Sequence, residues 1–166
     1  TRSVTFININ IQFLKGENMK TDFEFLTTEI DGHILTVTIN RPEVMNALHP
    51  PAHAEFDEVW NEFDKDEDLW VGIVTGAGDR AFSAGNDLKF QAQAGGKMDI
   101  NIASSGFAGL TSRFNLTKPL IAAVNGVSMG GGFEIALACD LIVTSTNAKF
   151  ALPEPKVGLA ALAGGM

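Results

Sequence analysis

The chain has 166 residues, of which 45% are hydrophobic and 19% are charged, a composition typical of one globular domain with its own core. The formal net charge of −8 argues against a nucleic-acid partner, and the longest apolar runs are too short to cross a bilayer. The one cysteine, Cys139, excludes an internal disulfide and fits a reducing compartment. We therefore expect a cytoplasmic protein with no membrane partner.

Residues 1–18 differ in character from the rest of the chain. They alternate like a strand, but they lack the basic region and small-residue cleavage site of a signal peptide. Lys15-Gly16-Glu17 matches a purine-rich coding stretch of the kind that precedes bacterial start codons, and Met19 follows closely. We expect residues 1–18 to be a translated leader or disordered extension of a bacterial protein, and residues 19–166 to be the N-terminal part of a catalytic domain.

Hydrophobic periodicity predicts strands that alternate with helices. Strands over 23–30 and 33–40 flank Asp31-Gly32, a pair favoured in type I′ hairpin turns. The remaining expected elements are a helix over 51–64, a strand over 69–75, a mobile surface stretch over 91–102, a helix around 107–114, a strand over 119–125, a turn over 126–132, a helix over 133–139, and strands over 140–144 and 149–151. This order predicts an α/β domain with partly parallel sheets.

Two short motifs suggest other functions. Residues 76–81 match the G-x-G-x-x-A dinucleotide fingerprint, but the sequence that follows lacks a long helix and the acidic residue that would contact the ribose. Residues 126–130 match G-x-S-x-G, so a serine hydrolase with Ser128 as nucleophile remains an alternative, although all three histidines precede that serine. The histidines show no metal-ligand spacing, and we expect them on the solvated surface.

The glycine-rich segment at 130–132 is the more informative feature. Three successive glycines at a helix start bring bare backbone N–H groups close to a ligand, and Glu134 falls in the first turn of that helix. A second turn of small residues lies at 84–87, where Asp87 is suited to cap a following helix, and Glu154 is held rigidly between two prolines. Two such turns can stabilise one oxyanion while two carboxylates move protons on a neighbouring carbon, which is the chemistry of an acyl thioester.

From Phe23 onward the sequence resembles the crotonase family, the enoyl-CoA hydratase and isomerase superfamily. The matching blocks, in order, are Asn40-Arg41-Pro42, Asn46-Ala47-Leu48, Phe82 to Leu88, Ala123 to Glu134, Cys139-Asp140, and Phe150 to Glu154 with Gly158. The resemblance implies a ββα-spiral core that is incomplete at the C-terminus, a coenzyme A thioester substrate, a homo-trimer or hexamer at full length, and no cofactor or metal besides the CoA of the substrate.

The resemblance also implies the site residues. Glu134 and Glu154 match the two catalytic glutamates of hydratases, and the backbone N–H groups of Asn86 and Gly131 match the oxyanion hole. The implied substrate-binding residues are Val44, Ala47, Ala84, Asn86, Asp87, Leu88, Lys89, Gly130 and Gly131. Because both glutamates are present, we expect an enoyl-CoA hydratase-like lyase that adds water to a 2-enoyl-CoA or dehydrates a 3-hydroxyacyl-CoA. Carnitinyl-CoA dehydratase or enoyl-CoA isomerase activity, and a non-catalytic oligomeric scaffold, remain alternatives.

Overall fold

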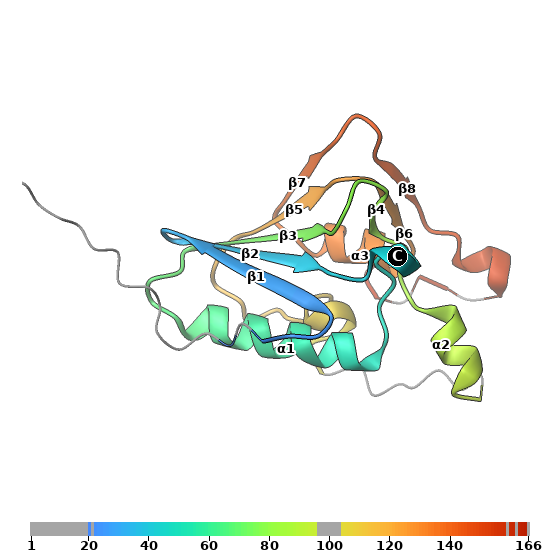
Figure 1. Ribbon diagram of the computed structural model, residues 1–166, viewed down its shortest axis with the longest axis horizontal. Helices are drawn as coiled ribbons and strands as arrows, with labels where there is room; N and C mark the ends of the chain where they lie inside the picture. The colour runs from blue at the N-terminus through green and yellow to red at the C-terminus, as the bar shows by residue number, and fades with distance from the viewer. Residues whose placement is uncertain (1–19, 21, 96–103, 159, 162, 166) are drawn as a thin grey trace, which may run out of the picture.

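The protein contains two β-sheets, and Figure 1 shows their arrangement in the computed structural model, which describes residues 20, 22–95, 104–158, 160–161 and 163–165. The larger sheet has the strand order β1-β2-β3-β5-β7 and the smaller sheet has the order β4-β6-β8. The strands of the larger sheet are β1 (Leu26–Asp31), β2 (Ile34–Ile39), β3 (Val71–Gly76), β5 (Leu120–Val124) and β7 (Leu141–Thr144); those of the smaller are β4 (Ala81–Ser83), β6 (Val127–Met129) and β8 (Lys149–Ala151).

The connection between the sheets is repetitive. Strands β3, β5 and β7 of the larger sheet each lead directly into one strand of the smaller sheet, namely β4, β6 and β8. Every pairing is parallel except that of β1 with β2. The expected α/β class with partly parallel sheets is therefore confirmed, and the repetition places the ends of successive strand pairs beside one another.

The hairpin strands and the first long helix agree with the sequence. Strands β1 and β2 pair antiparallel as expected, but Asp31 pairs with Ile34, so the turn is centred on Gly32-His33 rather than on Asp31-Gly32. Gly32 has a φ of +57° and His33 has no positive φ, so the predicted type I′ turn does not form. Helix α1 (Pro50–Lys65) carries two prolines in its first turn and lies along one face of the hairpin sheet (Figure 1). Its buried face consists of Ala52, His53, Phe56, Val59, Trp60 and Phe63, which supply much of the hydrophobic core.

The helix expected around 107–114 is absent from the structure. A short 3₁₀ turn, η2 (Phe107–Gly109), forms instead, and Ala108 has a φ of +53° that an α-helix does not allow. This turn packs on α1, where the Trp60 Nε1–H donates to the Ala108 carbonyl at 3.2 Å. Phe114, which completed the apparent helical pattern, is 92% exposed, so the pattern did not reflect a buried face.

The remaining elements surround the smaller sheet. They are η1 (Pro42–Val44), α2 (Leu88–Gln93), α3 (Gly131–Leu137) and η3 (Glu154–Val157). Helix α2 occupies the start of the stretch expected to be mobile, whose later part lies outside the described residues, as does the boundary predicted at Met19. The turn expected over 126–132 instead contains β6. In the described part of the chain, no helix is long and apolar enough to cross a membrane.

Candidate active site

The two small-residue turns predicted from the sequence touch one another. Gly85 has a φ of +85°, and a Cβ added there would lie 2.9 Å from the Gly131 nitrogen and 2.7 Å from the Met129 carbonyl oxygen. A Cβ on Gly132 would lie 2.2 Å from the Ser83 carbonyl oxygen. Only glycine allows backbone to approach backbone this closely, so these glycines bring the 84–87 turn against the start of α3.

Each turn contains one backbone N–H group that has no hydrogen-bond acceptor among the described residues. The Leu48 N–H donates to the Gly85 carbonyl and the Asp87 N–H donates to the Leu48 carbonyl, both at 2.7 Å, so the bridge between residues 48 and 86 does not use the Asn86 N–H. Gly131 begins α3, where the first N–H groups have no partner within the helix. Within the described residues, neither the Asn86 N–H nor the Gly131 N–H has an acceptor.

Glu134 lies on the buried side of α3, in the first turn of the helix and two residues after the last of the three glycines. Its side chain is 4% exposed, and its Oε1 accepts hydrogen bonds from the Ala163 N–H at 2.8 Å and the Gly165 N–H at 3.0 Å. Burial raises the pKa of Glu134 above its ordinary value, and the nearby charge of Glu154 adds to the increase, whereas the two backbone hydrogen bonds oppose it. Proton affinity is thereby increased at this carboxylate.

Glu154 also lies close to this glycine turn. It begins η3 after β8, and a Cβ added to Gly130 would lie 2.8 Å from the Glu154 Oε1. The Glu154 Oε2 is buried and has no hydrogen-bond partner among the described residues. Glu154 therefore lies against the 130–132 turn that leads into Glu134, its charge affects the pKa of Glu134, and it has a buried oxygen available to a ligand.

The loop at 41–48 lies against the 84–87 turn. The Arg41 guanidinium pairs with the Asp87 carboxylate at 3.0 Å and donates to the Ala47 carbonyl oxygen. Asp87 also accepts the Phe90 N–H at 3.1 Å, which confirms it as the cap of α2. The predicted substrate-binding residues Val44, Ala47, Ala84 and Asn86 to Lys89 are thus gathered in one region, although Leu88 is exposed at 51% and Lys89 also faces solvent.

Two of the three histidines do not lie on the surface as expected. His49 and His53 are 5% and 3% exposed because the start of α1 is covered on both sides. The His53 Nδ1 accepts the Ala108 N–H at 3.1 Å, and burial lowers its pKa to about 4. The His49 ring lies edge-on to Phe25 and Phe90, at centroid distances of 4.4 and 5.0 Å. A polar helix start on the sequence was therefore a misleading sign of exposure.

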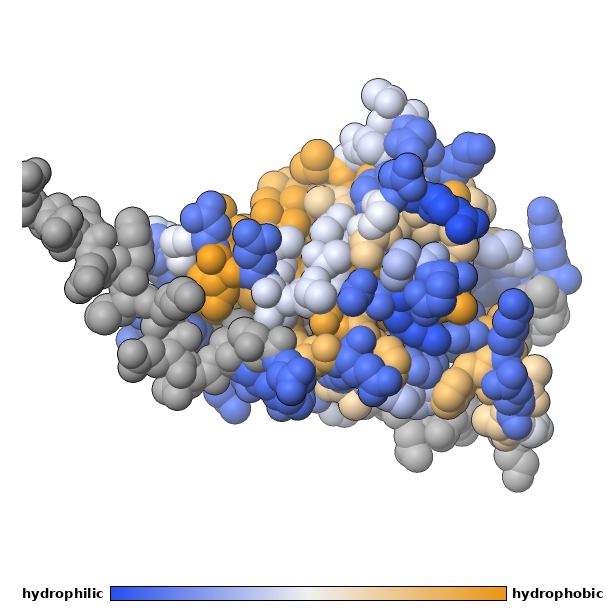
Figure 2. Space-filling model, viewed as in Figure 1, coloured by the Kyte–Doolittle hydropathy of each residue, from blue (hydrophilic) through white to orange (hydrophobic). Residues whose placement is uncertain are grey.

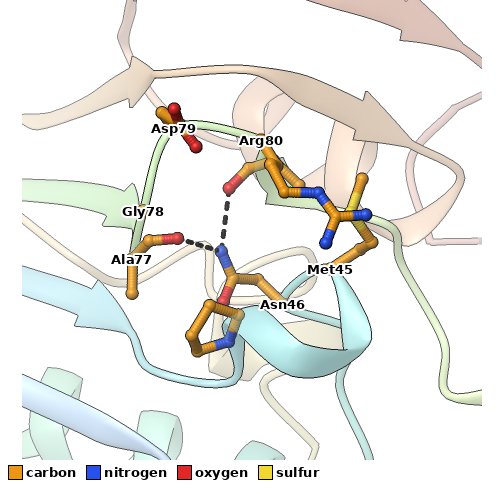
Figure 3. A pocket seen from close by; sticks show the side chains of 8 residues that line it. Met45, Asn46, Ala77, Gly78, Asp79 and Arg80 are labelled. Carbon is orange, nitrogen blue, oxygen red and sulfur yellow. Dashed lines mark hydrogen bonds between the residues drawn. The ribbon is translucent and has the colours of Figure 1, made fainter.

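The two competing motifs have structural roles. Ser128 is fully buried within β6, whereas a hydrolase nucleophile must project from a sharp turn, so the serine hydrolase alternative is not supported. The residues of the dinucleotide-like motif connect β3 to β4 rather than to a helix and line a cavity of about 170 Å³ with Pro42, Met45 and Asn46 (Figure 3). That cavity includes neither glutamate. Among the described residues, no group of three or more His, Cys, Asp or Glu side chains is placed to hold a metal ion.

Sequence comparison identifies curated proteins that are similar to this chain. A carnitinyl-CoA dehydratase from Escherichia coli strain K12 is 51% identical over 136 residues, which are 82% of this chain and 51% of that protein. A carnitinyl-CoA dehydratase from Citrobacter koseri is 50% identical over 135 residues, again 51% of its length. The chain therefore spans about half the length of the curated relatives it matches.

Structural comparison gives the same result. An enoyl-CoA hydratase from Mycobacterium tuberculosis H37Rv superposes with a TM-score of 0.77 at 40% identity, covering 85% of this chain and 54% of that one. A carnitinyl-CoA dehydratase from Mycobacterium avium 104 superposes with a TM-score of 0.78 at 42% identity, covering 85% and 55%. These likenesses confirm the expected crotonase-like core. The model of the enoyl-CoA hydratase/isomerase family matches residues 29–166, and the chain belongs to this family.

Proposed function

We propose that the chain carries the acyl-CoA site of a lyase that adds water to a 2-enoyl-CoA, or removes it from a 3-hydroxyacyl-CoA. The observation that supports this proposal most directly is that Glu134 and Glu154 lie close to one glycine turn, which has an N–H without an acceptor among the described residues. A thioester carbonyl needs donors where its oxygen becomes negative, and water addition needs one group to take a proton and another to supply one.

In the proposed mechanism, the Asn86 and Gly131 N–H groups donate to the thioester oxygen. The Glu134 carboxylate takes a proton from water while the water oxygen bonds to the β-carbon, and negative charge moves onto the thioester oxygen as an enolate. Glu154 then protonates the α-carbon, so that the elements of one water molecule have been added. The raised pKa of Glu134 makes its carboxylate a stronger base for this step.

Dehydration of carnitinyl-CoA is the second candidate, because relatives with that name are 51% identical to this chain over 136 residues. The same two carboxylates and the same donors serve it in reverse, with a proton leaving the α-carbon and hydroxide leaving the β-carbon as water. The candidates differ only in the acyl group. Comparison of a short 2-enoyl-CoA with carnitinyl-CoA as substrates separates them by their kcat/KM values.

The same family resemblance supports our proposals about the setting of this reaction. We propose a homo-trimer or hexamer of the whole protein, and a cytoplasmic location that agrees with the free Cys139. The chemistry needs no separate cofactor, since CoA arrives with the substrate. Sedimentation of the purified protein tests the assembly.

The test of the proposed function follows the loss of conjugated-thioester absorbance of a short 2-enoyl-CoA. Glu134→Gln and Glu154→Gln should each lower kcat by roughly 10²–10⁴, the usual contribution of a general acid or base. Glu29→Gln is the matched control, because Glu29 is exposed on β1, and it should leave kcat unchanged. Turnover that survives in both site variants would contradict the two-carboxylate mechanism. Binding of the thioester without turnover would point to another reaction of the family.

A further inference from the structure

The hydroxyl group of Ser83 connects two segments of the site. Ser83 is fully buried at the end of β4, immediately before the 84–87 turn. Its Oγ–H donates to the Asn46 carbonyl at 2.8 Å, and the same oxygen accepts the Gly85 N–H at 3.1 Å. A single buried hydroxyl therefore joins the 41–48 loop to the residue that precedes Asn86.

The other end of this connection is held firmly. Asn46 is fully buried with a φ of +55°, and its Oδ1 accepts the Arg41 N–H at 3.1 Å. Its Nδ2 donates to the Ala77 carbonyl at 3.0 Å and to the Ala81 carbonyl at 2.8 Å (Figure 3). Because the side chain is tied at three points, the Asn46 carbonyl is a fixed reference for the Ser83 hydroxyl.

The downstream side of Asn86 is held independently. Asp87 is tied to Arg41 and to the first turn of α2, and its N–H donates to the Leu48 carbonyl. Upstream of Asn86 lies Gly85, and glycine can adopt more backbone conformations than any other type of residue. The φ of +85° at Gly85 therefore needs contacts that hold it in place. Within the described residues, two hydrogen bonds supply that constraint: the Gly85 carbonyl accepts the Leu48 N–H at 2.7 Å, and the Gly85 N–H donates to the Ser83 hydroxyl at 3.1 Å.

We propose that Ser83 is a positioning residue: held by Asn46, its hydroxyl fixes Gly85 from the N–H side, as the Leu48 N–H does from the carbonyl side, and so helps to direct the Asn86 N–H toward the thioester oxygen. This inference rests on the proposed function, in which that N–H belongs to the oxyanion hole. A hydrogen bond weakens steeply as its angle falls, so a rotation of the peptide between Gly85 and Asn86 reduces stabilisation of the enolate without removing any group that contacts the substrate.

The chain offers a matched control for this proposal. Ser128 pairs with Ser83 in the register of β4 and β6 and is also fully buried, but its hydroxyl has no partner among the described residues. Ser83→Ala and Ser128→Ala therefore remove the same atom from neighbouring buried positions, and only the first breaks the connection to Asn46. Ser83→Cys keeps the size of the side chain and replaces the hydroxyl with a weaker donor and acceptor.

The experiment titrates each variant with 4-(dimethylamino)cinnamoyl-CoA, whose absorption band moves to longer wavelength as its carbonyl is polarised. The titration gives the dissociation constant and the band shift separately, and thermal unfolding shows that each variant is folded. We expect a full shift in the wild type and in Ser128→Ala. In Ser83→Ala we expect a measurable part of the shift to be lost while the dissociation constant changes little, and a smaller loss in Ser83→Cys. In turnover, the loss should appear as a ~10- to 100-fold lower kcat.

A folded Ser83→Ala variant with the full band shift would overturn the inference and leave the proposed function intact. If that variant does not fold, Ser83→Cys decides, since an undiminished shift in Ser83→Cys would overturn it equally. A wild type that binds the probe with no band shift would overturn the proposed oxyanion hole, and the positioning role with it.

Discussion

Replacement of Gly85 by alanine tests the contact between the two glycine turns. The new Cβ would lie 2.7 Å from the Met129 carbonyl oxygen and 2.9 Å from the Gly131 nitrogen, both of them backbone atoms that cannot rotate away. The φ of +85° adds strain of about 1–2 kcal/mol for any residue with a Cβ, and overpacking adds about 1–3 kcal/mol. Together these values predict that Gly85→Ala lowers the free energy of unfolding by about 2–5 kcal/mol.

The matched control is Gly32→Ala in the hairpin turn. Gly32 has a φ of +57°, but a Cβ there would meet nothing within 4 Å, so this variant should lose only the strain of about 1–2 kcal/mol. Urea unfolding measures both values, and the fluorescence of the fully buried Trp60 reports on the core. If Gly85→Ala were no less stable than Gly32→Ala, the turns would not be packed as described, and the argument for a shared oxyanion site would fail.

Two further predictions concern stability and association. The pKa of a histidine in the unfolded chain is near 6.5, whereas burial lowers the pKa of folded His53 to about 4. The neutral His53 side chain therefore contributes its full share of the unfolding free energy above pH 6.5. That contribution is lost as the pH falls toward 4. The unfolding free energy should be about 2 kcal/mol lower at pH 5 than at pH 7, and His53→Gln should flatten this difference in urea titrations. Among the described strands, β7 lies at one edge of the larger sheet, where Leu141 and Val143 are each 60% exposed and Figure 2 shows hydrophobic residues gathered. Leu141→Lys and Val143→Lys should therefore reduce concentration-dependent association in sedimentation velocity. Unchanged association would mean that this edge does not cause it.

The parts of the fold that the sequence predicted are those with a long local pattern. The hairpin, α1 and strands β3, β5 and β7 each show several residues of clear periodicity or a recognised turn pair. Strand β8 was predicted although it has three residues, but β4 and β6, of the same length, were missed because each stands beside a glycine-rich turn and pairs with the other more than 40 residues along the chain. Their small residues resemble a turn until the partner strand is known.

In the candidate site, too, the residues with a local sequence signal were predicted and those that act through distant contacts were not. The two glutamates and both glycine turns were predicted because each has a local signal, and the structure brings the turns together. The contributions of Asn46 and Ser83 were not predicted, since they act through hydrogen bonds to residues 31 to 37 positions away along the chain. The burial of His49 and His53 was missed for a similar reason, because the segments that cover them, including Phe25, Phe90 and Phe107, are distant in sequence.

The uncommitted N–H groups follow from the topology rather than from any special residue. In a parallel bridge, a residue between two hydrogen-bonded neighbours directs its own N–H away from the partner strand, and Asn86 occupies that position opposite Leu48. A helix start also leaves its first N–H groups unpaired, and Gly131 occupies that position in α3. Because each of these donors is fixed by backbone pairing, the side chain at position 86 is free to vary without loss of the donor. The residues that must stay are those that fix the backbone, which are Gly85, Gly132 and, by our inference, Ser83.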